Sequence, residues 1–122
     1  MIVEKLKYII WAKDLARSVG FYRQVFGAEV VHQSEVMAEL MIAGGVLGIH
    51  GGGEGNRTWT GLNFQVNDLF GACEALIAAG GQIPRPPIDT PDEPAHLAMC
   101  VDLDGNEIMI SWRRGPRMPD TK

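Results

Sequence analysis

The side chains that could act as nucleophiles do not form a recognisable catalytic constellation in this sequence. Ser18, Ser34 and Ser111 lie outside the Gly-x-Ser-x-Gly turn that exposes a hydrolase nucleophile. Cys73 and Cys100 have no histidine directly beside them that could accept the thiol proton. The local sequence therefore carries no signal for nucleophilic catalysis, although catalytic groups can also assemble from distant parts of a chain.

A second candidate for chemistry is the glycine-rich segment from His50 to Asn56. Its backbone N–H groups could surround a phosphate, but a phosphate-binding loop also needs Lys-Ser or Lys-Thr and a helix directly after it. Neither follows here. We therefore interpret the segment as a flexible connection between strands.

The first half of the chain is predicted to form a strand, a helix and three further strands. Residues 6–13 are rich in Tyr, Ile and Trp and alternate loosely, as a strand does. Asp14 is placed to cap the following helix, whose apolar residues recur at helical spacing until Gly27 supplies a left-handed end. Three short strands are expected next, at Glu29–Gln33, Val36–Ile42 and Val46–His50.

The second half repeats this order of elements. Thr60–Val66 alternates strictly between apolar and polar residues, and Asp68 is placed to cap a helix that stops at Gly80. A strand begins at Gln82, and the proline-rich stretch 84–94 is predicted to be an exposed loop, because proline is excluded from the middle of a sheet. The last two strands, joined by a tight Asp-Gly turn, are expected at Leu97–Asp102 and Glu107–Trp112.

The two halves therefore form a structural repeat, in which Lys7 corresponds to Gly61 and Asp14 corresponds to Asp68. One such unit cannot bury both of its faces, so each module is expected to pack on the other. We predict one domain over residues 1–114, with module one at about 1–55 and module two at about 56–114. A flexible tail is predicted at 115–122.

Composition and charge narrow the classes of partner. The 122 residues carry a net charge of −4, which argues against nucleic acid and anionic membranes, because both require a basic surface. No apolar run reaches the length of a membrane span, and the first residues lack the apolar core of a signal peptide, so a cytoplasmic location is expected. Cys73 and Cys100 are expected to be buried free thiols.

Two segments resemble the vicinal-oxygen-chelate superfamily, which includes glyoxalase I, extradiol dioxygenases, bleomycin-resistance proteins and fosfomycin-resistance enzymes. Residues 12–27, AKDLARSVGFYRQVFG, are similar to its Asp-Leu-x-x-Ser-x-x-Phe-Tyr helix, and residues 101–110, VDLDGNEIMI, to its Asp-Pro-Asp-Gly-Asn turn and strand. The resemblance extends from about Leu6 to Trp112. It implies an α+β fold in which two βαβββ modules form an open, curled mixed sheet, with helices on the outer face and a ligand on the concave inner face.

The resemblance also implies where a metal would bind, because metal-dependent members place one ligand on each of four inner strands. The corresponding positions here are Lys7, Gly61, Gly48 and Met109. A protonated lysine repels a cation, glycine has no side-chain donor, and methionine sulfur prefers soft metals. We therefore expect no metal and no other cofactor, and we expect the two glycines to leave space on the floor of the site.

An alternative metal site is shifted by two residues along the same strands. His50 and Glu107 share the strand parity of Gly48 and Met109, and His96 could add a third ligand. With a metal acting as a Lewis acid, the protein would be a lyase or isomerase of glyoxalase type, or a dioxygenase. This site requires at least three ligands to converge. Without a metal, His50 is either a polar residue beside the glycine-rich loop or a contact to an organic ligand.

Strand parity also predicts the lining of the inner face. The residues proposed to bind ligand are Ile9, Trp11, His50, Trp59, Asn63, Gln65 and Met109. This mixture suits a planar or amphipathic organic molecule, held by stacking and a few hydrogen bonds. Trp11 and Met109 could equally be core residues, and Asn63 and Gln65 could face bulk water. Lys7 is interpreted as a solvated charge at the rim.

The leading hypothesis is a metal-free protein that binds a small organic molecule without changing it, similar to the bleomycin-resistance branch, which sequesters an antibiotic or metabolite. The same resemblance implies a homodimer with ligand grooves at its interface. Whether the modules pair within one chain or between two chains is left open, as is whether the loop 84–94 closes over the site. A third hypothesis is a subunit or sensor domain, which an exposed apolar patch away from the cleft would favour.

Overall fold

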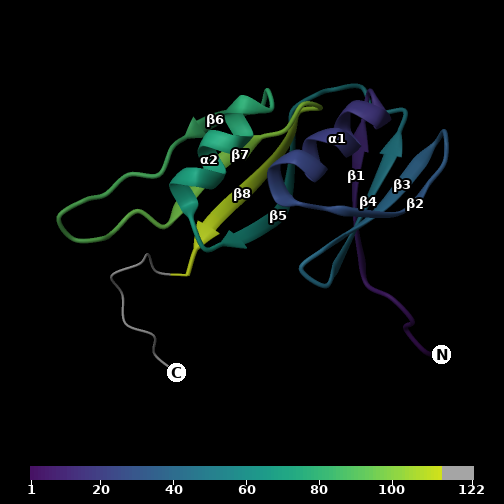
Figure 1. The fold of residues 1–122 in the computed structure, drawn as a ribbon, viewed down its shortest axis with the longest axis horizontal. Coiled ribbons are helices and arrows are strands. Elements are labelled where there is room, and N and C mark those ends of the chain that lie inside the picture. Colours follow the sequence, from purple (N-terminus) through teal and green to yellow (C-terminus); the bar gives the residue numbers. More distant parts are fainter. Residues whose placement is uncertain (114–122) are drawn as a thin grey trace.

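The computed structural model describes residues 1–113, in which two successive modules share one order of elements (Figure 1). Module one contains β1 (Lys7–Ala12), α1 (Leu15–Phe26), β2 (Glu29–Gln33), β3 (Met37–Ile42) and β4 (Gly45–Gly51). Module two contains β5 (Thr58–Val66), α2 (Leu69–Ala78), β6 (Gln82–Arg85), β7 (Leu97–Val101) and β8 (Asn106–Trp112). The predicted α+β fold of two βαβββ modules is confirmed, whereas the tail predicted at 115–122 lies outside the described residues.

Each module forms its own four-stranded mixed sheet. The strand order is β1-β4-β3-β2 in the first sheet and β5-β8-β7-β6 in the second. β1 is parallel to β4, and β5 is parallel to β8, while the other neighbouring strands are antiparallel. The predicted mixed sheet is therefore present as two open sheets, with β1 and β5 each at an edge.

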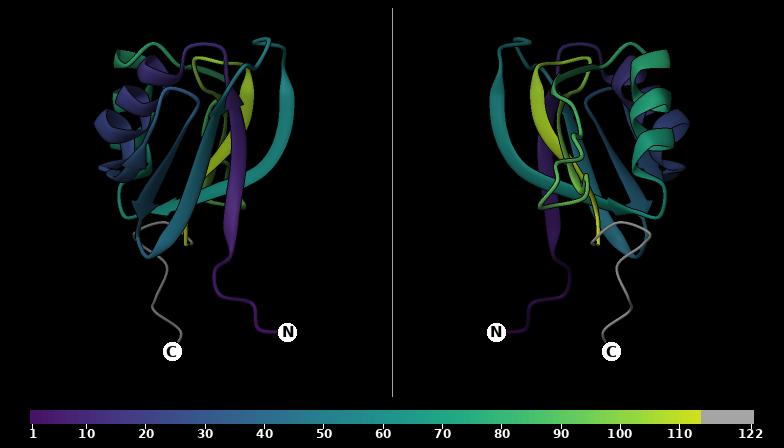
Figure 2. Two further views of the ribbon diagram at one scale, coloured as in Figure 1. Left: turned by 90° about the vertical axis from the view of Figure 1, so that its right-hand side faces the viewer. Right: turned by 90° about the vertical axis from the view of Figure 1, so that its left-hand side faces the viewer.

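The helices cover one face of the sheets. Figure 2 shows α1 and α2 together on one side of the molecule and the strands on the other. Strand residues that point toward the helices are buried, such as Ile10 and Ala12 in β1 and Ile108 and Ile110 in β8. The sequence alternation correctly predicted this face, because successive side chains of a strand point to opposite sides.

Both helices begin at the aspartates that the sequence predicted as caps. Asp14 Oδ1 accepts a hydrogen bond from the backbone N–H of Arg17 at 3.2 Å, and Asp68 Oδ1 accepts one from Gly71 at 3.0 Å. Each carboxylate satisfies an N–H group that has no partner within its helix. Gly27 ends α1 with a φ of 66°, as predicted for a left-handed terminus.

One predicted boundary is wrong at β6. The sequence placed the start of the proline-rich loop at Pro84, whereas β6 extends to Arg85 and includes this proline. β6 is the outermost strand of the second sheet, and its pairing with β7 shifts register between Gln82 and Arg85. Proline is tolerated there because an edge strand has one side without a partner, so a missing N–H group can face solvent.

A buried polar cluster at the β7–β8 connection joins the two modules. The Tyr22 hydroxyl donates a hydrogen bond to Asp102 Oδ2 at 2.7 Å, and the Asn106 side-chain amide donates to the same oxygen at 2.9 Å. The Asn106 amide also donates to the backbone carbonyl of Trp11 at 2.9 Å. We call Tyr22, Asp102 and Asn106 the inter-module cluster, because it connects α1 and β1 to the end of module two.

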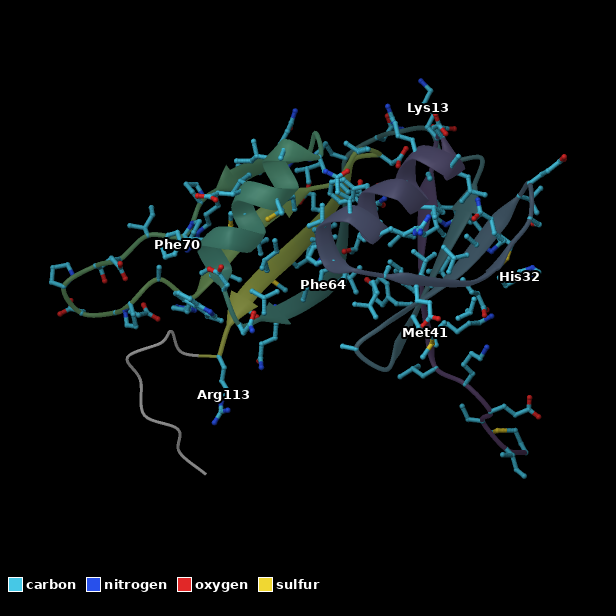
Figure 3. All side chains as sticks on the ribbon, in the orientation of Figure 1. Lys13, His32, Met41, Phe64, Phe70 and Arg113 are labelled. Atoms are coloured by element: carbon cyan, nitrogen blue, oxygen red, sulfur yellow. The ribbon has the colours of Figure 1, made fainter. Side chains whose placement is uncertain are left out.

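Burial governs the ionisation of the inter-module cluster. It raises the pKa of Asp102, while hydrogen bonds from Tyr22 and Asn106 act in the opposite direction. Burial and the charge of Asp102 raise the pKa of Tyr22 well above its usual value, so the phenol remains a hydrogen-bond donor at neutral pH. Beside the cluster, the rings of Phe26 and Phe64 stack at 3.9 Å, and Phe64 lies at the junction of the modules (Figure 3).

Both cysteines are buried free thiols, as predicted. Burial raises the pKa of Cys100 to about 12, which keeps this thiol protonated and unreactive at neutral pH. Within residues 1–113, neither helix has the length and hydropathy needed to cross a bilayer.

Candidate functional site

The sheet face opposite the helices lies open in the single chain. On this inner face Trp11 is 54% exposed, Trp59 is 57% exposed and Ile9 is 40% exposed. Large apolar side chains that are exposed together on one face mark a candidate interaction or ligand surface. The inner face is therefore the candidate site, and each module supplies one half of it.

The half supplied by module one is aromatic and apolar. Trp11 and His50 are paired across β1 and β4, and their rings lie 5.0 Å apart at 38°. Ile9 pairs with Gly48 in the same register, and its Cδ1 lies 2.5 Å from where a Cβ of residue 48 would stand. The structure therefore brings Ile9, Trp11 and His50 together, but it corrects the expected empty floor at Gly48, since Ile9 fills that space.

A charged cluster occupies the end of the same half. Lys7 Nζ lies 2.7 Å from Glu39 Oε2, and Lys5 Nζ lies 3.3 Å from Glu39 Oε1. Hydrogen bonds from Lys7 and Lys5 lower the pKa of Glu39, so the carboxylate stays ionised. Sequence reasoning missed Glu39. This residue shares the strand parity of Met37 and Met41 along β3, which could have placed it on the inner face.

The half supplied by module two is neutral and hydrogen-bonding around Asn63 and Ser111, while the ion pair of Glu107 and Arg57 lies at its other end. The Ser111 hydroxyl donates a hydrogen bond to Asn63 Oδ1 at 2.8 Å, and Gln65 pairs with Ser111 across β5 and β8. Met109 is half-buried and pairs with Met99 of β7. Asn63, Gln65 and Met109 therefore share this half.

Trp59 lies at the opposite end of β5 from Gln65, across from Glu107 of β8. Gly61, between them, has a φ of 76°, in the left-handed region, and the β5–β8 register shifts between Trp59 and Asn63. A glycine is needed there for backbone reasons. If residue 61 carried a Cβ, the nearest atom to it would be the Tyr8 hydroxyl oxygen at 3.7 Å, an ordinary contact distance, so the space beside Gly61 is not filled as it is at Gly48.

The residues of the alternative metal site are engaged in separate places. His50 contacts Trp11, and Glu107 forms an ion pair with Arg57 at 3.1 Å. His96 Nε2 lies 2.6 Å from Glu93 Oε2. Within residues 1–113, no three His, Cys, Asp or Glu side chains group closely enough to hold a metal ion. His50, Glu107 and His96 therefore do not converge within the described part of one chain, as the ligands of a hard divalent cation would have to.

A second concavity, which the sequence did not predict, lies between the two modules. It has a volume of about 860 Å³ and is lined by α1, α2, β1, β5 and the β3–β4 hairpin. Of the residues predicted to bind ligand, Asn63 and Gln65 also line this concavity. We call it the inter-module groove; its walls are mainly apolar, including Val25, Phe26, Leu62, Phe64, Ala72 and Ala75.

Comparisons with known proteins agree with this architecture. The family model of the Glyoxalase/Bleomycin resistance protein/Dioxygenase superfamily matches residues 5–110. No curated protein matches the sequence significantly.

Several solved structures share the fold at low sequence identity. The fosfomycin resistance protein FosX from Listeria monocytogenes has a TM-score of 0.76 at 21% identity, covering 96% of this chain and 97% of FosX. A mutant of FosX, complexed with Mn(II) and 1S,2S-dihydroxypropylphosphonic acid, has a TM-score of 0.72 at 23% identity, covering 90% of both chains. A glyoxalase-related enzyme from Fulvimarina pelagi has a TM-score of 0.72 at 21% identity, covering 91% and 89%.

Proposed function

The chain belongs to the glyoxalase/bleomycin resistance protein/dioxygenase superfamily, and we propose that it binds a small organic molecule without a metal and without changing it chemically. The observation that carries the proposal is the chemistry of the inner face. It presents two exposed tryptophans and neutral hydrogen-bonding groups, while the positions that the family uses for metal ligands hold Lys7, Gly48, Gly61 and Met109.

The two halves of the inner face favour a planar or amphipathic ligand. Trp11 and His50 offer ring surfaces on module one, to which a flat ligand can stack. Asn63 and Gln65 on module two offer amide donors and acceptors that would orient it. An antibiotic or metabolite with a flat apolar part and a polar edge fits this arrangement, in which binding comes from shape and stacking.

A homodimer forms part of this proposal. The inner face of a single chain leaves Trp11 and Trp59 more than half exposed, and a ligand on an open sheet would remain largely in water. Ligand sites normally bury most of the ligand surface. A second copy placed over this face would enclose the site, and we propose that the dimer acts in the cytoplasm.

Tryptophan fluorescence tests the binding proposal directly. A panel of planar and glycopeptide antibiotics is titrated into the wild type, Trp11→Phe and Trp112→Phe. We expect saturable quenching that is mostly lost in Trp11→Phe. Trp112→Phe is the matched control, because Trp112 lies at the end of β8 and packs against Phe70 of α2, with 5.8 Å between the ring centroids. Equal loss in both variants, or no response across the panel, would contradict a stacking site on the inner face.

The second candidate function is a metal-dependent lyase, isomerase or dioxygenase, and a structural relative complexed with Mn(II) favours it. In a dimer, His50 of one chain and Glu107 of the other could bind the same metal ion, although the two residues lie apart within one chain. Elemental analysis of protein purified without chelators separates the two functions. We expect less than stoichiometric metal; a stoichiometric ion that is lost in His50→Ala would replace the binding proposal with the enzymatic one.

A further inference from the structure

Met37, His50 and Trp11 stand in one row across three neighbouring strands of the first sheet. Met37 of β3 pairs with His50 of β4, and His50 pairs with Trp11 of β1. Directly paired residues of antiparallel strands point to the same face, with about 5 Å between their Cβ atoms. The thioether of Met37 therefore lies beside the imidazole of His50, on the face that carries Trp11. We call these three residues the inner-face row.

The imidazole of His50 is positioned by packing, and its nitrogens are not used elsewhere in the described chain. Its ring lies 5.0 Å from the ring of Trp11 at 38°, and the residue is half-buried. Within residues 1–113, His50 forms neither a hydrogen bond nor an ion pair through its side chain. A neutral imidazole has a nitrogen lone pair, which at this position can bind an ion.

The carboxylate nearest to the row along β3 is already engaged. Glu39 shares the strand parity of Met37 and lies two residues from it. Its two oxygens contact Lys7 Nζ at 2.7 Å and Lys5 Nζ at 3.3 Å. Glu39 therefore has two cations as partners and is a poor oxygen donor for a metal ion beside Met37.

The donors that remain in the row are those that soft ions prefer. Thioether sulfur selects Cu(I) over hard divalent ions, and imidazole nitrogen also binds copper. The indole of Trp11 adds a ring face, which attracts cations within about 6 Å of its centroid. All three side chains stand on paired strands, which hold a site more precisely than loops do. The row thus combines a nitrogen donor, a sulfur donor and an aromatic cover.

We propose that the inner-face row binds Cu(I) through an imidazole nitrogen of His50 and the sulfur of Met37, with the indole of Trp11 covering the ion. The inference goes beyond the proposed function, because the ion and the organic molecule are different ligands. They share Trp11 and His50, so each should compete with the other. The ion also differs from that of the enzymatic candidate, which would be divalent and bound with Glu107.

Nuclear magnetic resonance of the full chain tests the row residue by residue. Ag(I), a soft monovalent ion that needs no reductant, is titrated in chloride-free buffer into protein labelled at its methionine methyl groups. We expect the Met37 methyl and His50 ring resonances to shift together and to saturate. Met41 is the internal control, because it lies toward the other end of β3 (Figure 3) and pairs with Val46 instead of a histidine. Equal shifts of Met37 and Met41 would overturn the proposal.

Two matched variants measure what the sulfur contributes. Met37→Leu removes the donor at nearly constant volume, and circular dichroism reports whether it is folded. We expect its dissociation constant for Ag(I), followed by the His50 ring resonances, to rise at least the roughly tenfold that loss of an outer-shell partner already costs. Met41→Leu should stay within about threefold of the wild type. An unchanged constant in folded Met37→Leu would overturn the proposal; if Met37→Leu does not fold, the wild-type shifts decide.

Other ions and the free thiols are separated by the same resonances. Zn(II) at equal concentration should leave the Met37 methyl unmoved, because zinc does not favour a thioether. Cu(I), added without oxygen, should shift the same resonances as Ag(I). A Met37 shift with Zn(II), or a response to Ag(I) but not to Cu(I), would contradict a Cu(I) site. Ions taken up by Cys73 or Cys100, which are free thiols, do not produce the joint shift of Met37 and His50.

The antibiotic panel separates this inference from the proposed function. Shifts at Met37 and His50 with Ag(I), in a protein that does not respond to the panel, would retain the ion site and reject the binding function. Normal quenching by an antibiotic, in a protein whose Met37 methyl does not move with Ag(I), would do the reverse.

Discussion

The two modules connect their last two strands in different ways, although they repeat the same order of elements. In module one, Ala43 and Gly44 turn between β3 and β4 with φ values of 50° and 82°, in the left-handed region. In module two, the β7–β8 connection instead holds Asp102 in a buried position, where it accepts hydrogen bonds from Tyr22 and Asn106. The first connection is a local turn, while the second depends on a residue of the other module.

The last hairpins of the two modules are therefore stabilised by different kinds of interaction. Module two completes its last hairpin with Tyr22 of α1 and the Trp11 carbonyl of β1. Module one has no matching requirement at Ala43 and Gly44, which stand at the surface of a hairpin. Damage to the β7–β8 connection should therefore destabilise the whole fold, whereas changes in the β3–β4 turn should act locally.

The largest expected effect comes from Asp102→Ala. This change leaves the Tyr22 hydroxyl, the Asn106 amide and the backbone N–H of Asp104 buried without their acceptor. We expect the free energy of unfolding to fall by about 3–5 kcal/mol, measured by urea denaturation. Asp102→Asn keeps the shape and one acceptor oxygen and should lose less. A loss below about 1 kcal/mol for Asp102→Ala would show that the cluster does not join the modules.

The next effect is expected from Gly105→Ala in the same connection. Gly105 has a φ of 86°, and an added Cβ would stand 2.5 Å from the backbone oxygen of Asn56. Backbone strain and this collision should together cost about 2–4 kcal/mol, measured by urea denaturation as above. The comparison is with Gly44→Ala in module one, where a Cβ meets nothing within 4 Å. Equal losses for both variants would remove the distinction between the two turns.

Tyr22→Phe is expected to cost about 1.5–3 kcal/mol at pH 7, because Asp102 loses a hydrogen bond from a buried donor. Burial and the charge of Asp102 raise the pKa of Tyr22, so the folded protein holds the phenol proton more tightly than the unfolded chain does. The resulting stability is complete below about pH 10 and is lost as pH rises above it. Urea titrations from pH 8 to 11 should show a steeper fall for wild type than for Tyr22→Phe; parallel curves would contradict this origin.

The smallest effect, and one of opposite sign, is expected from Ala43→Gly. Ala43 is a non-glycine residue with positive φ, and glycine adopts this conformation without steric cost. We expect a gain of up to about 1 kcal/mol, visible as a higher Tm in thermal denaturation. A lower Tm would mean that the entropy lost by glycine on folding outweighs the relief of strain.

Local patterns in the sequence were enough to predict most elements of the fold. Asp14, Asp68 and Gly27 act within one turn of their helices, so their roles do not depend on the rest of the chain. The predicted strand boundary at Pro84 was wrong because a proline is tolerated in an edge strand, and only the order of strands in the sheet shows that β6 is one. The prediction of open space at Gly48 was wrong for a related reason, because the Ile9 side chain of the neighbouring strand fills that space.

The sequence by itself determined which side of each strand packs under a helix, because the period of two along a strand is a local property that burial of apolar side chains selects. Only the tertiary structure decided what lies together across the chain, such as Lys7 with Glu39 and Tyr22 with Asp102. It also decided that residues of both modules line the inter-module groove. These contacts join segments far apart in sequence, and their geometry depends on how the two modules pack.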